Sequence, residues 1–332
     1  ALADRGRRVV VLESGQVKST SKFQELASGS ILTPDTHHSP EDTVARQLGG
    51  TSNLWGGRCV PYDSIDFTAR PWLGIDSWPI AKTDLDPYLP AATAALDAGP
   101  AVYTDPIGTL DIDTAAFRTD RLERWSGQPR THLKHMARLK GDCSPWVALR
   151  VTVTDLLRGE GERINGVQLT IDGDATPREL HGEEVIVAGG GLASTQLLLN
   201  VQAQCPSLFG GEDGPLGKYY MGHLNGQIAD IVFTSGALQD KLGFYTDAAK
   251  TYVRRRIYPT EELQERERIA NTVFWPVVPE IANPAHRSGA LSAVFLGLTL
   301  PILGPRLIPE TIRQRHVGYP PYRRIPHIRN II

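Results

Sequence analysis

Residues 48–59 read Leu48-Gly49-Gly50-Thr51-Ser52-Asn53-Leu54-Trp55-Gly56-Gly57-Arg58-Cys59. Four glycines and three small polar residues surround one tryptophan. Glycine lets the backbone come close to a flat ligand, and hydroxyl and amide groups can hold the ligand's polar edges. We interpret residues 49–57 as a cofactor cradle and call them the cradle below. The competing interpretation is an ordinary surface loop, because glycine clusters also mark turns.

The composition is that of a globular protein. The chain has 332 residues, of which 41% are hydrophobic and 22% charged, enough to bury a large core in two domains. Its 35 basic and 37 acidic residues give a net charge of -2. This balance gives no electrostatic attraction to nucleic acid or to an anionic membrane surface. Small molecules are therefore the expected partners.

Cysteines and apolar runs bear on the location. Cys59, Cys143 and Cys205 are widely spaced and form no CxxC pair, so we expect neither a disulfide framework nor a zinc site. No basic and then apolar leader opens the sequence. The most apolar run, residues 291–303, is shorter than a bilayer span and contains Pro301. We expect a cytoplasmic protein without a membrane span, with this run buried in a core.

The first residues predict the second half of a βαβ unit. Residues 1–6 are typical of a helix that ends at Gly6, and residues 7–13 of a buried parallel strand. Glu13 ends this strand, where dinucleotide-binding folds place the acid that binds the adenosine ribose, about 20 residues after a GxGxxG turn. That count leads back beyond Ala1, so we expect the turn to belong to sequence outside this chain. Alternatively, Glu13 simply ends a strand at the solvent.

Residues 14–47 are polar and show little apolar periodicity, which predicts a loop-rich connection. His37 and His38 are adjacent and would face different ways in a regular backbone. No Cys, Asp or Glu completes a ligand spacing with them. We predict no metal site.

Segments after the cradle resemble a known family. Trp78-Pro79-Ile80 is followed by Asp84-Leu85-Asp86-Pro87-Tyr88, which opens an alanine-rich helix through Ala98. This series is similar to the glucose-methanol-choline family of FAD-dependent oxidoreductases, in its bacterial, pyranose-oxidase-like branch. The resemblance implies an α/β fold, α+β overall. It would combine an incomplete Rossmann-like FAD-binding domain with a substrate domain that has a mostly antiparallel sheet.

The resemblance also implies roles for the cradle, which would lie along the flavin and pyrophosphate. Ser52 and Asn53 would be polar contacts, and Trp55 and Gly56 would lie near the isoalloxazine. Leu54 aligns with the position where sugar oxidases of this branch can carry a histidine joined to the flavin, so noncovalent FAD is expected. The FAD contacts expected in this stretch are Gly49, Gly50, Thr51, Ser52, Asn53, Leu54, Trp55 and Gly56. Trp72 and Trp78 are interpreted as packing residues.

The middle of the chain holds three weaker patterns. Residues 114–125 show a moderate helical spacing, and residues 130–140, with His132 and His135, predict a short solvated helix. Residues 147–157 and 163–171 predict a hairpin closed by a turn over residues 159–162. In enzymes of the resembled family such a hairpin contacts the adenine, which implies Val153 as a contact.

Residues 184–199 predict a buried strand, a glycine turn and an apolar helix. Ser194 stands where a dinucleotide fingerprint needs Gly or Ala, and a turn follows where an acid-ended strand is required, so this is not the primary phosphate loop. It resembles the family's segment beneath the cofactor, which implies Ala188 and Gly189 as FAD contacts. The alternative is that these glycines serve only to pack the helix on the sheet.

The last third resembles a substrate domain. Residues 217–223 are similar to the family's entry into that domain, and residues 227–233, 251–258 and 270–276 predict strands. Alternation places Arg254 and Arg256 on one face and Arg255 on the other. Such a pair suits a polyol or acidic substrate, but we interpret it as a solvated strand face.

The predicted domains are residues 1–100, the first part of the FAD-binding domain; 101–144, a connection; 145–215, its second part; and 216–332, an incomplete substrate domain. The family oxidises the CH–OH group of an alcohol or sugar by hydride transfer to flavin, with a histidine as base. His316-Val317-Gly318-Tyr319 is the nearest text to the family's His-Gly-Thr motif and lacks the threonine. We therefore assign no catalytic residue, expect the base beyond Ile332, and expect this chain alone to be inactive.

Two alternatives stay open. The chain could be a truncated homologue without catalysis that acts as a binding or interaction protein. It could also belong to an NAD-dependent Rossmann enzyme, because Glu13 alone does not distinguish NAD from FAD.

Overall fold

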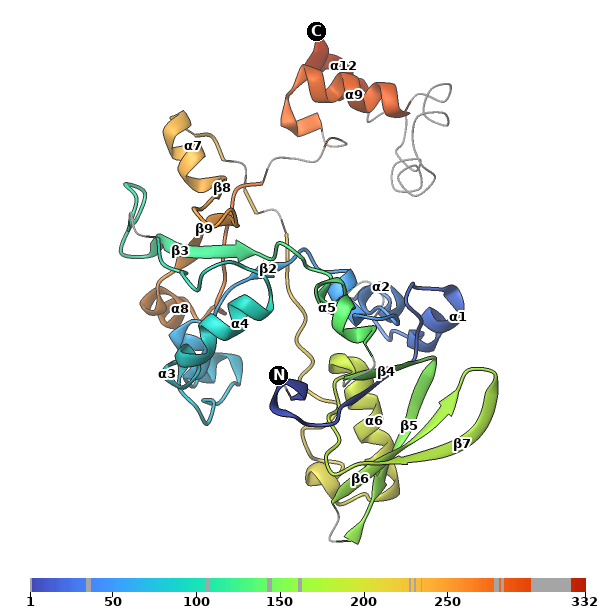
Figure 1. The fold of residues 1–332 in the computed structure, drawn as a ribbon. Coiled ribbons are helices and arrows are strands. Elements are labelled where there is room, and N and C mark those ends of the chain that lie inside the picture. Colours follow the sequence, from blue (N-terminus) through green and yellow to red (C-terminus); the bar gives the residue numbers. More distant parts are fainter. Residues whose placement is uncertain are drawn as a thin grey trace. The chain divides into compact units, whose positions relative to one another are not determined.

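The computed structural model describes residues 2–33, 37–105, 108–141, 145–160, 163–226, 228–229, 231–233, 235–277, 281, 284–299 and 324–332. The chain forms two units (Figure 1): residues 1–232 with 244–272, and residues 233–243 with 273–332. Each unit is described by itself. The finer domain boundaries expected from the sequence stay predictions.

The first unit contains all the strands of the described residues. They are β1 (Val10–Glu13), β2 (Arg58–Cys59), β3 (Phe117–Trp125), β4 (Trp146–Leu149), β5 (Val151–Arg158), β6 (Ile164–Ile171), β7 (Asp174–His181), β8 (Phe244–Thr246) and β9 (Tyr252–Pro259). Its α-helices are α1 (Ser21–Gln24), α2 (Pro40–Thr43), α3 (Lys82–Leu85), α4 (Leu89–Ala95), α5 (Thr131–Leu139), α6 (Gly190–Gln204) and α8 (Glu261–Glu267). Helices and strands thus share this unit, and the predicted α/β class is confirmed.

β1 and β4 form a parallel pair, with Val10 opposite Trp146 and Glu13 opposite Leu149. The parallel strand predicted over residues 7–13 is confirmed over residues 10–13, but its expected burial is wrong, since Val10 and Val11 are 49% and 41% exposed. The single strand expected over residues 147–157 is divided instead, because Arg150 adopts a left-handed φ of +61° between β4 and β5. This residue turns the chain out of the parallel pair.

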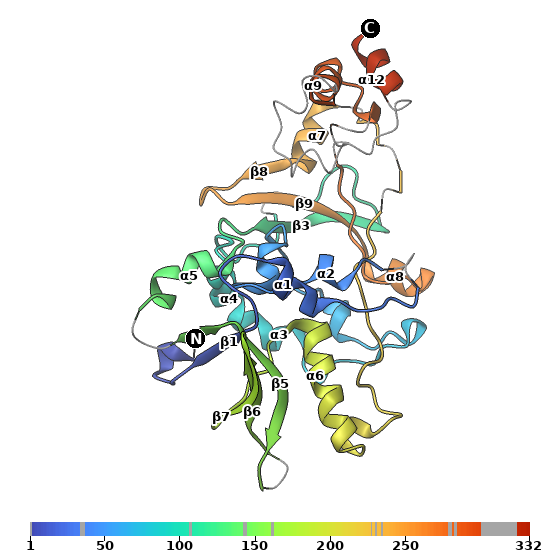
Figure 2. The same ribbon diagram turned by 90° about the vertical axis from the view of Figure 1, so that its right-hand side faces the viewer.

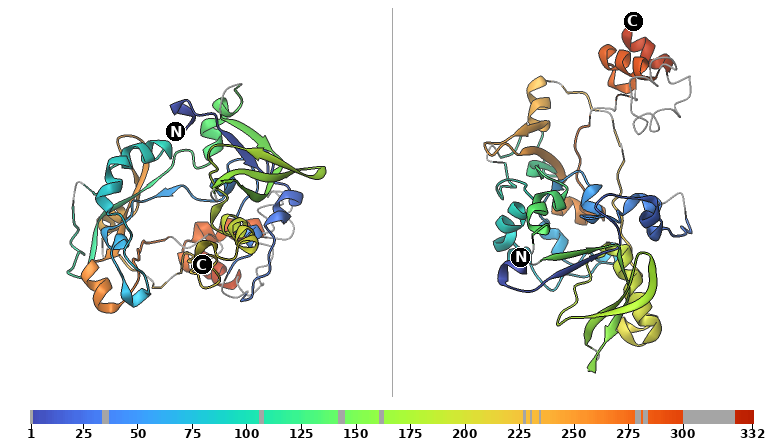
Figure 3. Two further views of the ribbon diagram at one scale, coloured as in Figure 1. Left: turned by 90° about the horizontal axis from the view of Figure 1, so that it is seen from below. Right: turned by 45° about the vertical axis from the view of Figure 1, so that its right-hand side comes forward.

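β5, β6 and β7 form an antiparallel meander. The predicted hairpin is confirmed in β5 and β6, although part of its turn, residues 161–162, lies outside the described residues. A core of Val151, Leu156, Val167, Leu169 and Val201 joins the meander to α6, and Figure 3 shows α6 beside these strands. α6 confirms the helical half of the pattern over residues 184–199.

The predicted buried strand before α6 is wrong. Residues 184–188 run without strand pairing to any described segment. Val185 and Val187 pack against the core of the meander, but the side chain between them, Ile186, is 65% exposed. One face of the segment is therefore covered and its backbone has no neighbouring strand.

A second, antiparallel sheet has the order β2-β3-β9-β8. Figure 2 shows β3, β9 and β8 of this sheet side by side. β9 confirms the strand predicted near residues 251–258. β3 corrects the helical spacing seen over residues 114–125. The strands predicted over residues 227–233 and 270–276 are wrong for their described residues, which form only an isolated bridge at Phe274; Gln227 and Asp230 lie outside the description. Ile228 and Val232 are exposed there, so their apolar side chains do not pack into a core.

The second unit contains α7 (Gly236–Leu242), α9 (Gly289–Thr299) and α12 (Arg324–Ile331). Phe295 of α9 is buried and stacks on His327 of α12, with ring centroids 4.3 Å apart. The apolar run is buried on this side only, since Val294 is 50% exposed, and residues 300–303 lie outside the description. Over the described ranges no helix has the length and apolar character needed to cross a membrane.

Candidate functional site

The candidate site begins at the carboxyl end of the β1–β4 pair, the edge where open α/β sheets bind their ligands. Oε1 of Glu13 accepts a hydrogen bond from the N–H of Gly15 at 2.7 Å. Burial raises the pKa of Glu13 above its usual value, while the Gly15 hydrogen bond and the nearby Arg46 guanidinium oppose this rise. Glu13 is thus a half-buried carboxylate, held in place by its own turn.

The chain then brings this carboxylate to the cradle. Gln16 forms a parallel bridge with Gln47, and the N–H of Leu48 donates to the carbonyl oxygen of Gln16 at 2.8 Å. A Cβ atom on Gly15 would lie 2.0 Å from the carbonyl oxygen of Arg46, so only glycine allows this approach. Glu13, which the sequence predicts to bind the ribose, and the cradle therefore lie on adjacent segments.

The cradle is a short 3₁₀ turn, Gly50–Asn53, entered through Gly49 at a φ of +87°. Nδ2 of Asn53 donates to the carbonyl oxygens of Leu48 and Gly50 at 3.1 and 2.8 Å. The hydroxyl of Ser52 donates to the carbonyl oxygen of Gly49 at 2.5 Å. These polar side chains fix the shape of the loop itself.

Helix α5 supports the cradle from one side. Oγ of Ser52 accepts a hydrogen bond from the N–H of Thr131 at 3.3 Å, and Nε1 of Trp55 donates to the carbonyl oxygen of Pro129 at 2.7 Å. His132 is only 9% exposed and lies against Gly49. The helix predicted over residues 130–140 is present, but the expectation that it is solvated is wrong at His132. Burial, and then Arg130, lowers the pKa of this imidazole.

The remaining face of the cradle is open. Thr51, Leu54 and Gly56 are exposed, and a Cβ atom on Gly50 or Gly56 would meet nothing within 4 Å. The open face thus consists of glycine backbone, one hydroxyl and one leucine side chain. This combination fits an uncharged flat ring close to the backbone, and FAD carries such a ring.

The other expected FAD contacts lie on neighbouring elements. Val153 is in β5, half-buried against the core of the meander. Ala188 and Gly189 are exposed directly before α6. The N–H of Arg150 donates to the carbonyl oxygen of Gly15 at 2.9 Å, which ties the start of β5 to the turn after Glu13. Glu13 and the cradle are connected through contacts, whereas no described contact joins Val153 or Gly189 to the cradle.

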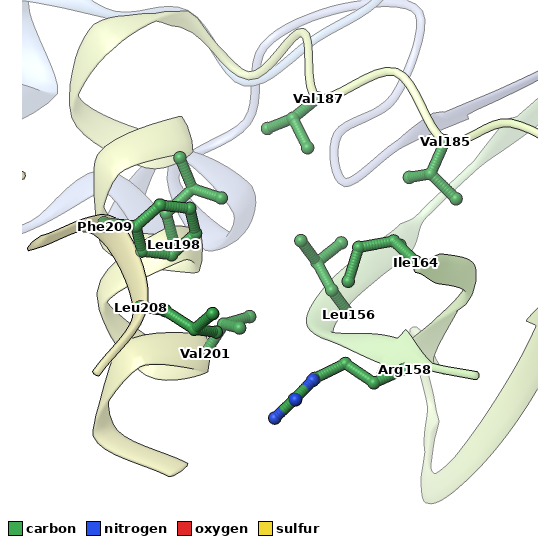
Figure 4. A pocket seen from close by; sticks show the side chains of 9 residues that line it. All are labelled: Leu156, Arg158, Ile164, Val185, Val187, Leu198, Val201, Leu208 and Phe209. Carbon is green, nitrogen blue, oxygen red and sulfur yellow. The ribbon is translucent and has the colours of Figure 1, made fainter. Parts of the chain in front are cut away.

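Sequence reasoning missed an apolar pocket of about 260 Å³ between α6 and the meander. Figure 4 shows side chains of α6 and of β5 and β6 facing each other across it. Its lining residues are Leu156, Arg158, Ile164, Val185, Val187, Leu198, Val201, Leu208 and Phe209. It shares none of them with the expected FAD contacts. Alternating apolar residues in β5 and β6 were the available signal, but they also describe an ordinary core.

The antiparallel sheet corrects a second expectation. Arg254 and Arg256 share one face and Arg255 takes the other, as the alternation predicted. The solvated face is wrong, because these arginines are 5%, 4% and 2% exposed and are paired with acidic side chains.

Trp78 is half-exposed and packs on Phe67, with ring centroids 5.6 Å apart, which agrees with a packing role. The described part of the chain contains no group of three His, Cys, Asp or Glu side chains able to hold a metal ion. Comparison with models of known families finds no match, and no curated protein matches the sequence significantly.

Proposed function

We propose that this chain belongs to an FAD-dependent oxidoreductase of the glucose-methanol-choline type, which oxidises a CH–OH group of an alcohol or sugar. The observation that carries the proposal is the link between Glu13 and the cradle through the Gln16–Gln47 bridge. A carboxylate at the end of a parallel strand is the group that binds the ribose in dinucleotide-binding folds. The glycine loop beside it leaves its backbone open to a flat ring, while the GxGxxG turn for the pyrophosphate is expected outside this chain.

In this proposal Glu13 binds the adenosine ribose and the open face of the cradle lies against the flavin. Bound flavin supplies the hydride acceptor for the reaction. Leu54 has no nucleophilic nitrogen, so the flavin is held without a covalent bond. Ser52, Asn53 and Trp55 act by fixing the loop, since their polar groups donate within the loop and to the segment before α5. We also propose a cytoplasmic location, in keeping with the free thiols of Cys59 and Cys205.

The visible spectrum of the protein purified from its whole reading frame tests this function. We expect flavin absorbance, and release of the flavin into the supernatant when the protein is precipitated with acid. Flavin that stays with the precipitate would overturn the noncovalent part. A colourless protein that takes up no FAD on incubation would overturn the assignment.

A matched pair of variants locates the cofactor. Glu13→Ala removes the proposed ribose ligand and should lower FAD retention, whereas Glu265→Ala removes an exposed glutamate of α8 and should not. The 332 residues alone should bind FAD weakly, because β1 pairs only with β4 among the described strands and its other edge stays open. Submicromolar binding by this chain would contradict that expectation.

A further inference from the structure

The antiparallel sheet gathers buried and partly exposed arginines on one face. The β3–β9 register sets Arg254 opposite Glu123 and Arg256 opposite Arg121. Arg58 of β2 reaches the same glutamate. Arg70 joins from the loop after β2, since it pairs with Asp66 at 3.5 Å and Asn271 bridges Asp66 to Asp63. We call this group the arginine face; its arginines are Arg58, Arg70, Arg121, Arg254 and Arg256.

Each acidic side chain of this face serves more than one cation. Glu123 is fully buried, accepts Nε and NH2 of Arg254 at 3.2 and 2.7 Å, and also pairs with Arg58. Oδ1 of Asp63 contacts NH2 of Arg256 and NH1 of Arg121, both at 2.6 Å. These carboxylates are therefore already shared between guanidinium groups.

The ion pairs given for the described residues of this face bring together more guanidinium groups than carboxylates. Five guanidinium groups meet the carboxylates of Glu123, Asp63 and Asp66. Asp120 lies at the border, where it accepts the hydroxyl of Tyr258 at 2.6 Å, and counting it still leaves an excess of one. Buried charge without a counter-charge is costly, so an anion from outside would be stabilised here.

A donor is also left over. Nε of Arg256 is fully covered and has no hydrogen-bond partner among the described residues, and Arg256 as a whole is 4% exposed. Guanidinium groups bind carboxylates well because their N–H groups match the two oxygens. The unused donor and the excess of guanidinium groups point to the same kind of ligand.

The arginine face reaches solvent beside aromatic rings. The side chains of Arg58 and Arg121 are 31% and 30% exposed. The guanidinium of Arg254 lies 5.0 and 4.8 Å from the ring centroids of Trp125 and Phe244, and Phe244 is half-exposed. Aromatic rings can pack against the C–H groups of a sugar chain. The anion bound here can therefore have a polyol chain attached to it.

The arginine face also adjoins the cradle. Arg58 follows Gly57 directly, and the N–H of Ser126, just after β3, donates to the carbonyl oxygen of Gly57 at 2.7 Å. We propose that the arginine face binds the carboxylate of a polyhydroxylated acid and that this acid is the substrate class. Its role as substrate rests on the proposed function, whereas its binding does not.

Calorimetry with the purified chain tests the binding without flavin. D-gluconate is the probe, and D-sorbitol, which has the same polyol chain without the carboxylate, is its control. We expect saturable binding of gluconate and none of sorbitol. Inorganic phosphate distinguishes the second source of an anion, and phosphate that binds as tightly as gluconate would overturn the carboxylate assignment. Equal binding of sorbitol, or no gluconate binding by the folded chain, would also overturn the proposal.

Variants then locate the binding. Arg121→Gln changes a partly exposed arginine and should weaken gluconate about tenfold or more. Arg266→Gln on the exposed side of α8 is the matched control and should leave the affinity unchanged. Circular dichroism checks that both variants fold, and a folded Arg121→Gln variant with unchanged affinity would contradict the site. If this chain binds gluconate but the protein from the whole reading frame takes up no FAD, the proposed function alone is defeated. If that protein holds FAD but this chain binds no gluconate, this inference alone is defeated.

Discussion

Gly49 lies directly against the imidazole of His132, so that a Cβ atom built on Gly49 would stand 2.4 Å from Nδ1 of that ring. The φ of Gly49 is +87°, a conformation that L side chains rarely adopt. Conformation and contact both demand glycine at the entrance of the cradle. The cradle's shape therefore depends on a helix more than 70 residues further along the chain.

Gly49→Ala should lower the free energy of unfolding by about 1 to 3 kcal/mol, because the methyl group adds both backbone strain and overlap with His132. Urea unfolding followed by tryptophan fluorescence measures this loss. Gly56→Ala in the same loop is the control, since its Cβ atom meets nothing within 4 Å, and it should change stability by no more than about 0.5 kcal/mol. Equal losses in the two variants would show that the contact is unimportant.

His132 should make stability depend on pH. Its pKa is lowered in the folded state, so the unfolded chain takes up a proton first as the pH falls below about 6.5. The free energy of unfolding should therefore decrease from that pH down to the lowered pKa. His132→Gln should reduce this decrease, with the exposed His135 of the same helix, changed to Gln, as control. A pH dependence that is the same in wild type and His132→Gln would contradict the prediction.

The sequence predicted those strands whose own residues show an apolar pattern. β1 is a run of apolar residues ended by Glu13, and β5 and β6 alternate over a core. The glycines of the cradle also indicated that another group comes close to the backbone there. The support of the cradle by His132 was not visible, because nothing within α5 indicates that it packs on a loop so far away in the chain.

β3 shows why the rest could not be predicted. Its central residues, Arg121, Glu123 and Arg124, are charged and mostly buried, because β9 lies alongside with complementary arginines. Charged residues normally indicate a solvent-exposed segment. Pairing between strands more than 100 residues apart produces no periodic pattern in either sequence. β7 was not predicted from the sequence for a different reason. Nearly all of its side chains are exposed, so its sequence has no apolar alternation to indicate a strand.

Glu123→Gln should destabilise the protein by about 3 to 5 kcal/mol, because it removes the carboxylate shared by Arg58 and Arg254 and leaves buried positive charge. Urea unfolding at neutral pH measures the effect. Glu267→Gln, which breaks the exposed pair with Arg266, should cost no more than about 0.5 kcal/mol. A Glu123→Gln variant as stable as this control would show that the Glu123 carboxylate is not needed to compensate the charge of Arg58 and Arg254.

Glu13 should act on stability with the opposite pH dependence to His132. Burial raises its pKa in the folded state, so the folded chain binds the proton more tightly than the unfolded chain. Its contribution is present at acid pH and is lost as the pH rises from about 4.5 through the raised pKa. Glu13→Gln keeps an acceptor for Gly15 without ionising. The stability of Glu13→Gln relative to wild type should therefore increase with pH across this window in urea titrations, and a flat difference would refute it.

Cys59 gives a direct report on the cradle. Its thiol is buried in β2, donates to the carbonyl oxygen of Gly57, and has a pKa raised by burial, all of which slow alkylation because the thiolate is the reactive form. Cys205 is only half-buried, so iodoacetamide should modify it well before Cys59 in the native protein, as followed by peptide mass spectrometry.

Denaturant should remove the difference between the two thiols. In the native protein, Gly49→Ala should speed the labelling of Cys59 specifically, because opening the cradle uncovers β2, which follows it. Gly56→Ala should not change this rate. If Cys59 reacts as fast as Cys205 in the native chain, β2 and the end of the cradle are not held against β3, contrary to the hydrogen bond from Ser126 to Gly57.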